Sequence, residues 1–263
     1  MFEDRSNPIL NSDAFLSRTR DGTPNMTALG VTVKTFALIG LVILAAAFSW
    51  SQTIGAPVEV VKDAGTLARF TAVPGYVYGY IAAGAVSGLV VALFTIFMPR
   101  IAVFSASVYA LCEGLSLGAL SGLYQRAYGG ELILTGVLAT LGVALATLGV
   151  YASGLIRPGG KFRAMVIVGM VGLILTYLLD IVLSWFGLNV PFVHSTGING
   201  IVFSLLAVTL ASFCLVLDFQ DIDEMIERGT PKDLEWYAGF AILVTLVWLY
   251  LEIIDLLAKS KSD

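Results

Sequence analysis

Seven apolar stretches, each long enough to cross a lipid bilayer, constrain this chain more than any other feature of its sequence. They cover residues 35–54, 76–97, 101–124, 132–155, 164–186, 197–217 and 237–257. A helix of about 20 apolar residues spans the hydrocarbon core of a membrane. Only 13% of the residues are charged, against about a quarter in a typical soluble domain. The sequence therefore predicts an all-α membrane protein, a bundle of seven transmembrane helices.

The chain divides into a polar start and one membrane domain. Residues 1–30 are rich in Asp, Arg, Ser, Asn and Thr and lack the apolar core of a cleaved signal peptide. We expect them to form a disordered cytoplasmic tail, and residues 31–263 to form the seven-helix domain. Cys112 and Cys214 both fall inside spans, where they serve packing rather than a disulfide. No Lys/Arg stripe suited to phosphates occurs, so nucleic acid is not an expected partner.

Orientation follows from the basic residues, which accumulate on the cytoplasmic side of membrane proteins. With the N-terminus inside, ten of the 15 Lys and Arg residues lie on the cytoplasmic face. These ten are Arg5, Arg18, Arg20, Lys34, Arg100, Arg157, Lys161, Arg163, Arg228 and Lys232. We therefore expect a multi-pass membrane protein with the N-terminus in the cytoplasm and the C-terminus outside.

Small residues recur at four-residue spacing in the second, third and fourth spans, a pattern that lets membrane helices approach closely. The pattern predicts that these three helices form the most tightly packed part of the bundle. The residues are Gly84 and Gly88, then Gly114, Gly118 and Gly122, then Gly142, Ala146 and Gly149.

Four acids lie within the seven stretches, which contain no Lys or Arg. Glu113 lies about 18 Å into its helix, near the middle of a core about 30 Å thick. A carboxylate at that depth costs at least about 2.5–3.5 kcal/mol, so it is either protonated or compensated by a cation or water. The alternative is a protonated Glu113 that only hydrogen-bonds a neighbouring helix. An intramembrane acid with no base favours a site for protons or metal cations.

The last span carries two acids three residues apart, Glu252 and Asp255, which therefore share one helix face. Two such carboxylates can share a proton or bind a cation. Asp255 also precedes Lys259 by four residues, so a simple ion pair is the alternative for that residue. Asp180 lies near the outer end of the fifth span, where an interfacial acid needs little explanation.

A second acidic cluster begins where the sixth span ends, and it predicts a helical extension that ends at Gly229. Glu224 precedes Arg228 by four residues, the favourable order for an ion pair on a helix. Asp218 and Asp221 lie closest to the membrane and are the functional candidates of this cluster. The spacing of these acids does not match an EF-hand loop.

One motif points towards an enzyme, because residues 114–118 read Gly-Leu-Ser-Leu-Gly and match G-x-S-x-G. A nucleophilic serine of that kind needs a strand-to-helix turn, whereas Ser116 lies inside an apolar helix. A membrane hydrolase that uses Ser116, His194 and Asp180 is the alternative interpretation of this motif. Our prediction is a protein without enzyme activity and without a cofactor.

Several of these segments resemble the Bax inhibitor-1 family, the transmembrane Bax inhibitor motif proteins, in its bacterial branch. The similar segments are residues 217–220 (Leu-Asp-Phe-Gln), 249–257 and 113–118. The resemblance implies seven helices with the last one near the centre of the bundle, a bacterial inner membrane as the location, and a pH-sensitive calcium leak. It also implies a proton-sharing pair of acids on the sixth and seventh helices, at positions that correspond here to Asp218 and Glu252.

Together the residues and the resemblance predict a calcium or cation leak gated by protonation of acids on the third, sixth and seventh helices. Asp218 and Glu252 are the expected calcium ligands. The span boundaries place Asp218 at the inner edge of the membrane and Glu252 in its outer half. Either Asp218 lies deeper than these boundaries indicate and contacts Glu252, or Asp218 pairs with Asp221 and Glu252 pairs with Glu113. The expected partners are lipid, calcium and protons. The alternative function is a non-conducting regulator that binds a membrane protease or stress factor.

Overall fold

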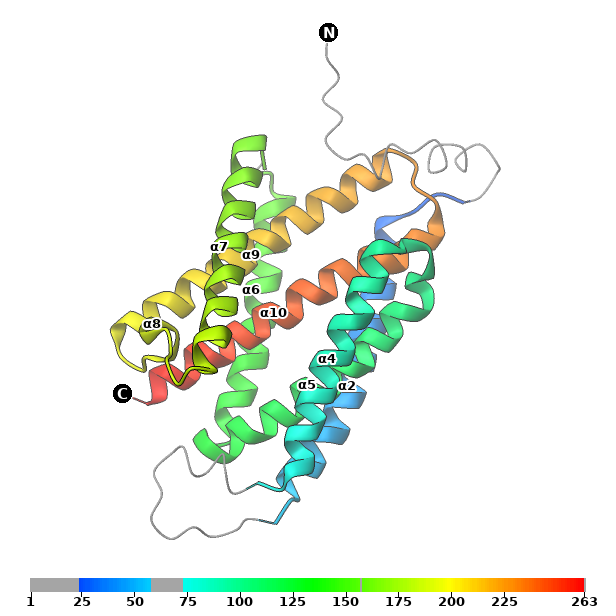
Figure 1. The fold of residues 1–263 in the computed structure, drawn as a ribbon. Coiled ribbons are helices and arrows are strands. Elements are labelled where there is room, and N and C mark those ends of the chain that lie inside the picture. Colours follow the sequence, from blue (N-terminus) through cyan, green and yellow to red (C-terminus); the bar gives the residue numbers. More distant parts are fainter. Residues whose placement is uncertain (1–23, 58–72, 157, 263) are drawn as a thin grey trace.

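The computed structural model describes residues 24–57, 73–156 and 158–262 (Figure 1). Within these ranges, seven helices are long and apolar enough to cross a membrane, which confirms the predicted fold class. The long helices are α2 (Ala28–Ile54), α4 (Gly75–Phe97), α5 (Ala102–Tyr128), α6 (Gly130–Ala152), α7 (Gly160–Ser184), α9 (Ile198–Glu227) and α10 (Glu235–Lys261). Shorter elements are η2 (Pro99–Ile101), α8 (Pro191–His194) and η3 (Lys232–Leu234).

Helix α9 extends ten residues beyond the predicted sixth span, from 217 to Glu227, and ends as the sequence predicts. Gly229 adopts a φ of 69°, a left-handed conformation that glycine tolerates best. The N–H of Gly229 donates to Ile226 O at 2.9 Å and that of Thr230 to Met225 O at 3.1 Å. These bonds satisfy carbonyls at the helix end, as in a Schellman cap.

Helix α10 runs between two groups of helices (Figure 1). In this view α4 and α5 lie on one side of it and α7 and α9 on the other, while α6 crosses behind it. It packs against α2, α5, α6 and α9, and its buried residues include Leu243, Leu249 and Ile254. The last helix therefore occupies the centre of the bundle, and Glu252 on it is buried among protein side chains.

Close helix packing occurs at the glycines, with one correction to the prediction. A Cβ atom on Gly84 of α4 would lie 2.6 Å from Cys112 O, and one on Gly118 of α5 would lie 2.1 Å from Ala46 O of α2. The α5 glycines therefore pack against α2, the first span, rather than α6. Gly142 and Gly149 of α6 have no neighbour within 4 Å of such a Cβ atom, so the prediction for the fourth span is wrong.

The segment just before α2 is joined to the connection between α9 and α10. The N–H of Met26 donates to Thr230 O at 2.7 Å, and the N–H of Lys232 donates to Pro24 O at 3.0 Å. The Met26 side chain is buried. The part of the expected tail that the structure describes thus packs against the bundle, whereas residues 1–23 lie outside the described residues. These contacts join the start of α2 to the end of the bundle where α9 ends.

Candidate functional site

Polar side chains line one face of α10 along much of its length. They lie at spacings of three and four residues, which places them on a single face of an α-helix. From one end to the other they are Thr245, Trp248, Glu252, Asp255 and Lys259. Thr245 and Lys259 contact the antiparallel helix α9 and Glu252 contacts α7, so this polar face forms a seam inside the bundle.

At one end of the seam, Asp218 of α9 meets Thr245 of α10. The Thr245 hydroxyl donates a hydrogen bond to Asp218 Oδ2 at 2.5 Å. Within the described residues, no Lys or Arg forms an ion pair with Asp218. A neutral hydroxyl is therefore the group that ties this acid to the central helix.

In the middle of the seam, the carboxyl of Glu252 is held by two neutral donors. The Tyr177 hydroxyl of α7 lies 2.8 Å from Oε1 and 3.1 Å from Oε2, and Trp248 Nε1 donates to Oε1 at 2.9 Å. Glu252 is only 5% exposed. In the part of the chain that the structure describes, no basic side chain forms an ion pair with it.

At the other end of the seam, Asp255 has a basic partner. Lys259 Nζ lies 2.6 Å from Asp255 Oδ2 and donates to Ser204 Oγ of α9 at 2.9 Å, while the Ser204 hydroxyl donates to Asp255 at 2.8 Å. Helix α10 continues past the predicted span to Lys261, so Lys259 lies within the helix, where it is only 6% exposed. The premise that the spans contain no buried base is thus wrong for Asp255, and the ion-pair alternative is confirmed.

The structure does not bring Asp218 and Glu252 together. Thr245, the α10 contact of Asp218, precedes Glu252 by seven residues, about 10 Å along the helix axis. Ala211 of α9 lies two turns before Asp218 and packs with Leu249 and Ile253 in a buried apolar cluster, in the stretch between the two acids. No group of three or more His, Cys, Asp or Glu residues suited to a metal occurs among the described residues. A calcium ion ligated jointly by Asp218 and Glu252 therefore does not fit this arrangement.

Glu113 lies away from the seam, between α5 and α4. A Cβ atom on Gly88 would lie 2.6 Å from Glu113 Oε1, so the glycine leaves the room that this carboxyl occupies. The side chain faces a neighbouring helix, as expected for a residue beside the glycine stripe. Glu113 forms no hydrogen bond or ion pair with the other described residues. It does not join Glu252, which excludes the pairing of those two acids in this conformation.

The acidic end of α9 is largely paired within the protein. Asp221 forms an ion pair with Arg163 of α7, and Asp223 accepts a hydrogen bond from Tyr151 of α6 at 2.6 Å. Arg228 Nη2 lies 3.1 Å from Glu224, which confirms the predicted ion pair. Asp221 therefore fixes α9 to α7 through a base and differs in that respect from Asp218.

Asp180 anchors the loop that carries α8. Its carboxyl accepts the N–H of Val190 at 2.9 Å and contacts His194 Nε2 at 2.7 Å. The Ser116 hydroxyl instead donates to Ile81 O of α4 at 3.2 Å. The three residues of the hydrolase alternative are therefore divided between two places, with Ser116 facing α4 and the other two joined at the end of α7.

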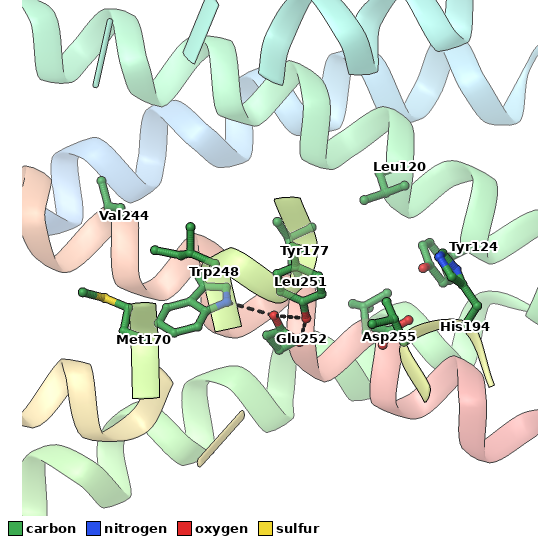
Figure 2. Close-up of a pocket in the computed structure, with 13 residues that line it drawn as sticks. Leu120, Tyr124, Met170, Tyr177, His194, Val244, Trp248, Leu251, Glu252 and Asp255 are labelled. Atoms are coloured by element: carbon green, nitrogen blue, oxygen red, sulfur yellow. Dashed lines mark hydrogen bonds between the residues drawn. The ribbon is translucent and has the colours of Figure 1, made fainter. Parts of the chain in front are cut away.

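A cavity of about 780 Å³ lies beside the middle of the seam (Figure 2). Side chains of α5, α7, α8 and α10 line it, and in Figure 2 the Tyr177 hydroxyl and the Trp248 indole point towards Glu252. Asp255, Tyr124 and His194 lie together towards one end of the view. The cavity thus gives Glu252 an open volume on the side of the bundle where α7 passes α10.

Comparison with known families decides the relationship of this chain. The family model described as Bax inhibitor 1 like matches residues 7–262. This chain belongs to the Bax inhibitor 1 like family. The match covers nearly the whole sequence, so the similarity to the family extends well beyond the short segments of the sixth and seventh helices. No curated protein and no solved structure matched the chain.

Membership of the Bax inhibitor 1 like family allows the contacts between α9 and α10 to be compared with those that the resemblance implied. The resemblance implied a proton-sharing pair of acids across the sixth and seventh helices. In this chain the residue of α10 that meets Asp218 is Thr245, a hydroxyl, and the acid of α10 lies two turns further along. The two protonatable groups are therefore separate, and each is tied to another helix by a neutral donor.

Sequence reasoning missed three residues of the candidate site in this Bax inhibitor 1 like protein. Thr245 and Trp248 lie seven and four residues before Glu252, so extending the helical spacing of the acids towards the start of the helix would have found both. Tyr177 had no such signal, because its role depends on how α7 crosses α10.

Proposed function

We propose that this membrane protein is a pH-sensitive leak for calcium and other cations, gated by protonation of carboxyls inside the bundle. Asp218 and Glu252 are the gating groups, on the sixth and seventh membrane helices. Glu113 on the third helix is a further protonatable group beside α4.

The observation that carries this proposal is the environment of Glu252. Glu252 is 5% exposed, and its carboxyl receives hydrogen bonds from Tyr177 and Trp248. Such donors stabilise a carboxylate without cancelling its charge, and among the described residues no Lys or Arg forms an ion pair with Glu252. A proton or cation is then the available counter-charge, and the cavity beside Glu252 gives it room.

The gate follows from what the two acids join. Glu252 ties α10 to α7 through Tyr177, and Asp218 ties α10 to α9 through Thr245. Hydrogen bonds to a charged carboxylate are stronger than those to a neutral group. Protonation of both acids therefore weakens two of the contacts that hold the central helix, and acidic pH favours a looser, conducting arrangement of α7, α9 and α10.

Reconstitution of the purified protein tests conduction itself. Liposomes that contain a calcium-sensitive dye should take up external calcium faster with the protein than without it, and faster at acidic than at neutral pH. Uptake equal to that of protein-free liposomes at every pH would refute the leak.

The alternative, a non-conducting regulator of a membrane protease or stress factor, has less support. Its docking surface would be the acidic end of α9, where Asp221, Asp223 and Glu224 already have partners in the chain. Flux separates the two functions, because a regulator that conducts nothing leaves the liposome dye unchanged.

A further inference from the structure

The cavity beside Glu252 combines an apolar wall with an acidic group. Its lining is largely aliphatic and aromatic and includes the rings of Tyr124, Tyr177 and Trp248. Its volume of about 780 Å³ lies within the range of about 300–1,000 Å³ that small-molecule sites occupy. An inorganic ion would leave most of this wall uncovered, so the cavity suits a ligand with a sizeable apolar body.

The charge of the lining has one sign. Glu252 and Asp255 are its acids, and no lysine or arginine lines it within the described residues. Asp255 is already paired with Lys259, and His194 contacts Asp180. Glu252 is therefore the carboxyl of the cavity that lacks a base in contact.

We propose that this cavity binds a hydrophobic organic cation, an amine, quaternary ammonium or phosphonium ion whose charge lies at Glu252. Aromatic rings attract cations to their faces, and three aromatic side chains line the cavity. An apolar anion of the same shape would meet the Glu252 charge and be repelled. The binding site is independent of the leak, since it requires neither conduction nor gating.

Equilibrium dialysis of the purified full chain in detergent tests this site, with tetraphenylphosphonium as the probe. Tetraphenylborate, an anion of nearly the same shape, controls for partition into micelles. The phosphonium ion should bind saturably at one site per chain, and tetraphenylborate should not. Glu252→Gln should weaken phosphonium binding at least 10-fold, whereas Asp223→Asn, which alters an exposed residue at the far end of α9, should leave it unchanged.

A second variant keeps the test informative if Glu252→Gln fails to fold. Ile174→Trp fills the cavity from α7 and retains the carboxyl, so it should also abolish saturable binding. Equal binding of the two probes, or an unchanged affinity in folded Glu252→Gln, would overturn the site. Dialysis uses no membrane and no gradient, so it measures binding alone. A negative binding result would not refute the calcium leak, and a negative flux result would not refute this binding site.

Discussion

The hydroxyl of Thr245 lies 2.5 Å from Asp218 Oδ2 and joins the sixth membrane helix to the central one. Glu252 makes the equivalent connection to α7 through Tyr177, two helical turns further along α10. The central helix is thus held at two levels by acids whose partners are neutral. In the proposed gate, this arrangement couples the protonation of each acid to helix packing.

Thr245→Val removes the donor to Asp218 while keeping the shape of the side chain. An acid that loses its partner in this setting destabilises the fold by about 1–3 kcal/mol. We expect a lower melting temperature in detergent and faster calcium uptake at neutral pH. Thr245→Ser retains the hydroxyl and is the control. Equal behaviour of the Val and Ser variants would show that the hydrogen bond has no role.

Tyr177→Phe removes the bond between α7 and Glu252. We expect the leak at neutral pH to rise towards its acidic level, because the variant lacks the contact that protonation weakens. Calcium uptake at the two pH values measures this change. Tyr151→Phe removes a comparable hydroxyl from Asp223, outside the seam, and should behave as the wild type. An unchanged neutral leak in Tyr177→Phe would count against α7 as a moving part.

Lys259→Met leaves Asp255 without its base. Breaking a fully buried ion pair costs about 3–5 kcal/mol. The Asp255 side chain is 38% exposed, so solvent screening reduces the expected loss to about 1–3 kcal/mol. The double variant Lys259→Met with Asp255→Asn removes both charges and should recover much of the stability. Thermal melts of the four proteins form a double-mutant cycle, and additive losses would contradict the coupling.

Gly118→Ala and Gly142→Ala make the same change in two different environments. The added methyl at Gly118 would lie 2.1 Å from Ala46 O, so α2 and α5 must separate, whereas nothing lies within 4 Å at Gly142. The first variant should lower the melting temperature clearly. The second should be neutral or gain up to about 1 kcal/mol from helix propensity. Similar melts for both would refute the close α2–α5 contact.

Hydrophobicity was enough to predict the helices, because a bilayer requires long apolar segments with satisfied backbones. Local spacing also predicted the Gly229 cap and the Glu224–Arg228 pair. Spacing within one helix could not show which helix faces which. It therefore could not show that the α5 glycines pack against α2 rather than α6, or that Glu113 contacts α4 rather than the seam.

The site was predicted in part for the same reason. Acids within the seventh span identified Glu252 and Asp255, and the acidic cluster after the sixth span identified Asp218, but most of their partners come from other helices or from beyond the predicted span. Lys259 was placed outside because the apolar stretch ends at 257, whereas α10 continues to Lys261 and buries the Lys259 side chain. Tyr177 depends on the crossing of two helices, which no local pattern encodes.

Calcium uptake into proteoliposomes across a pH series, with Glu252→Gln and Asp218→Asn prepared separately, tests the gate most directly. Each amide imitates a protonated acid, so uptake at neutral pH should rise and its dependence on pH should flatten. Glu227→Gln, at the exposed end of α9, should retain the wild-type curve. If Glu252→Gln and Asp218→Asn both take up calcium at the wild-type rate and with the wild-type pH dependence, gating by these carboxyls is contradicted.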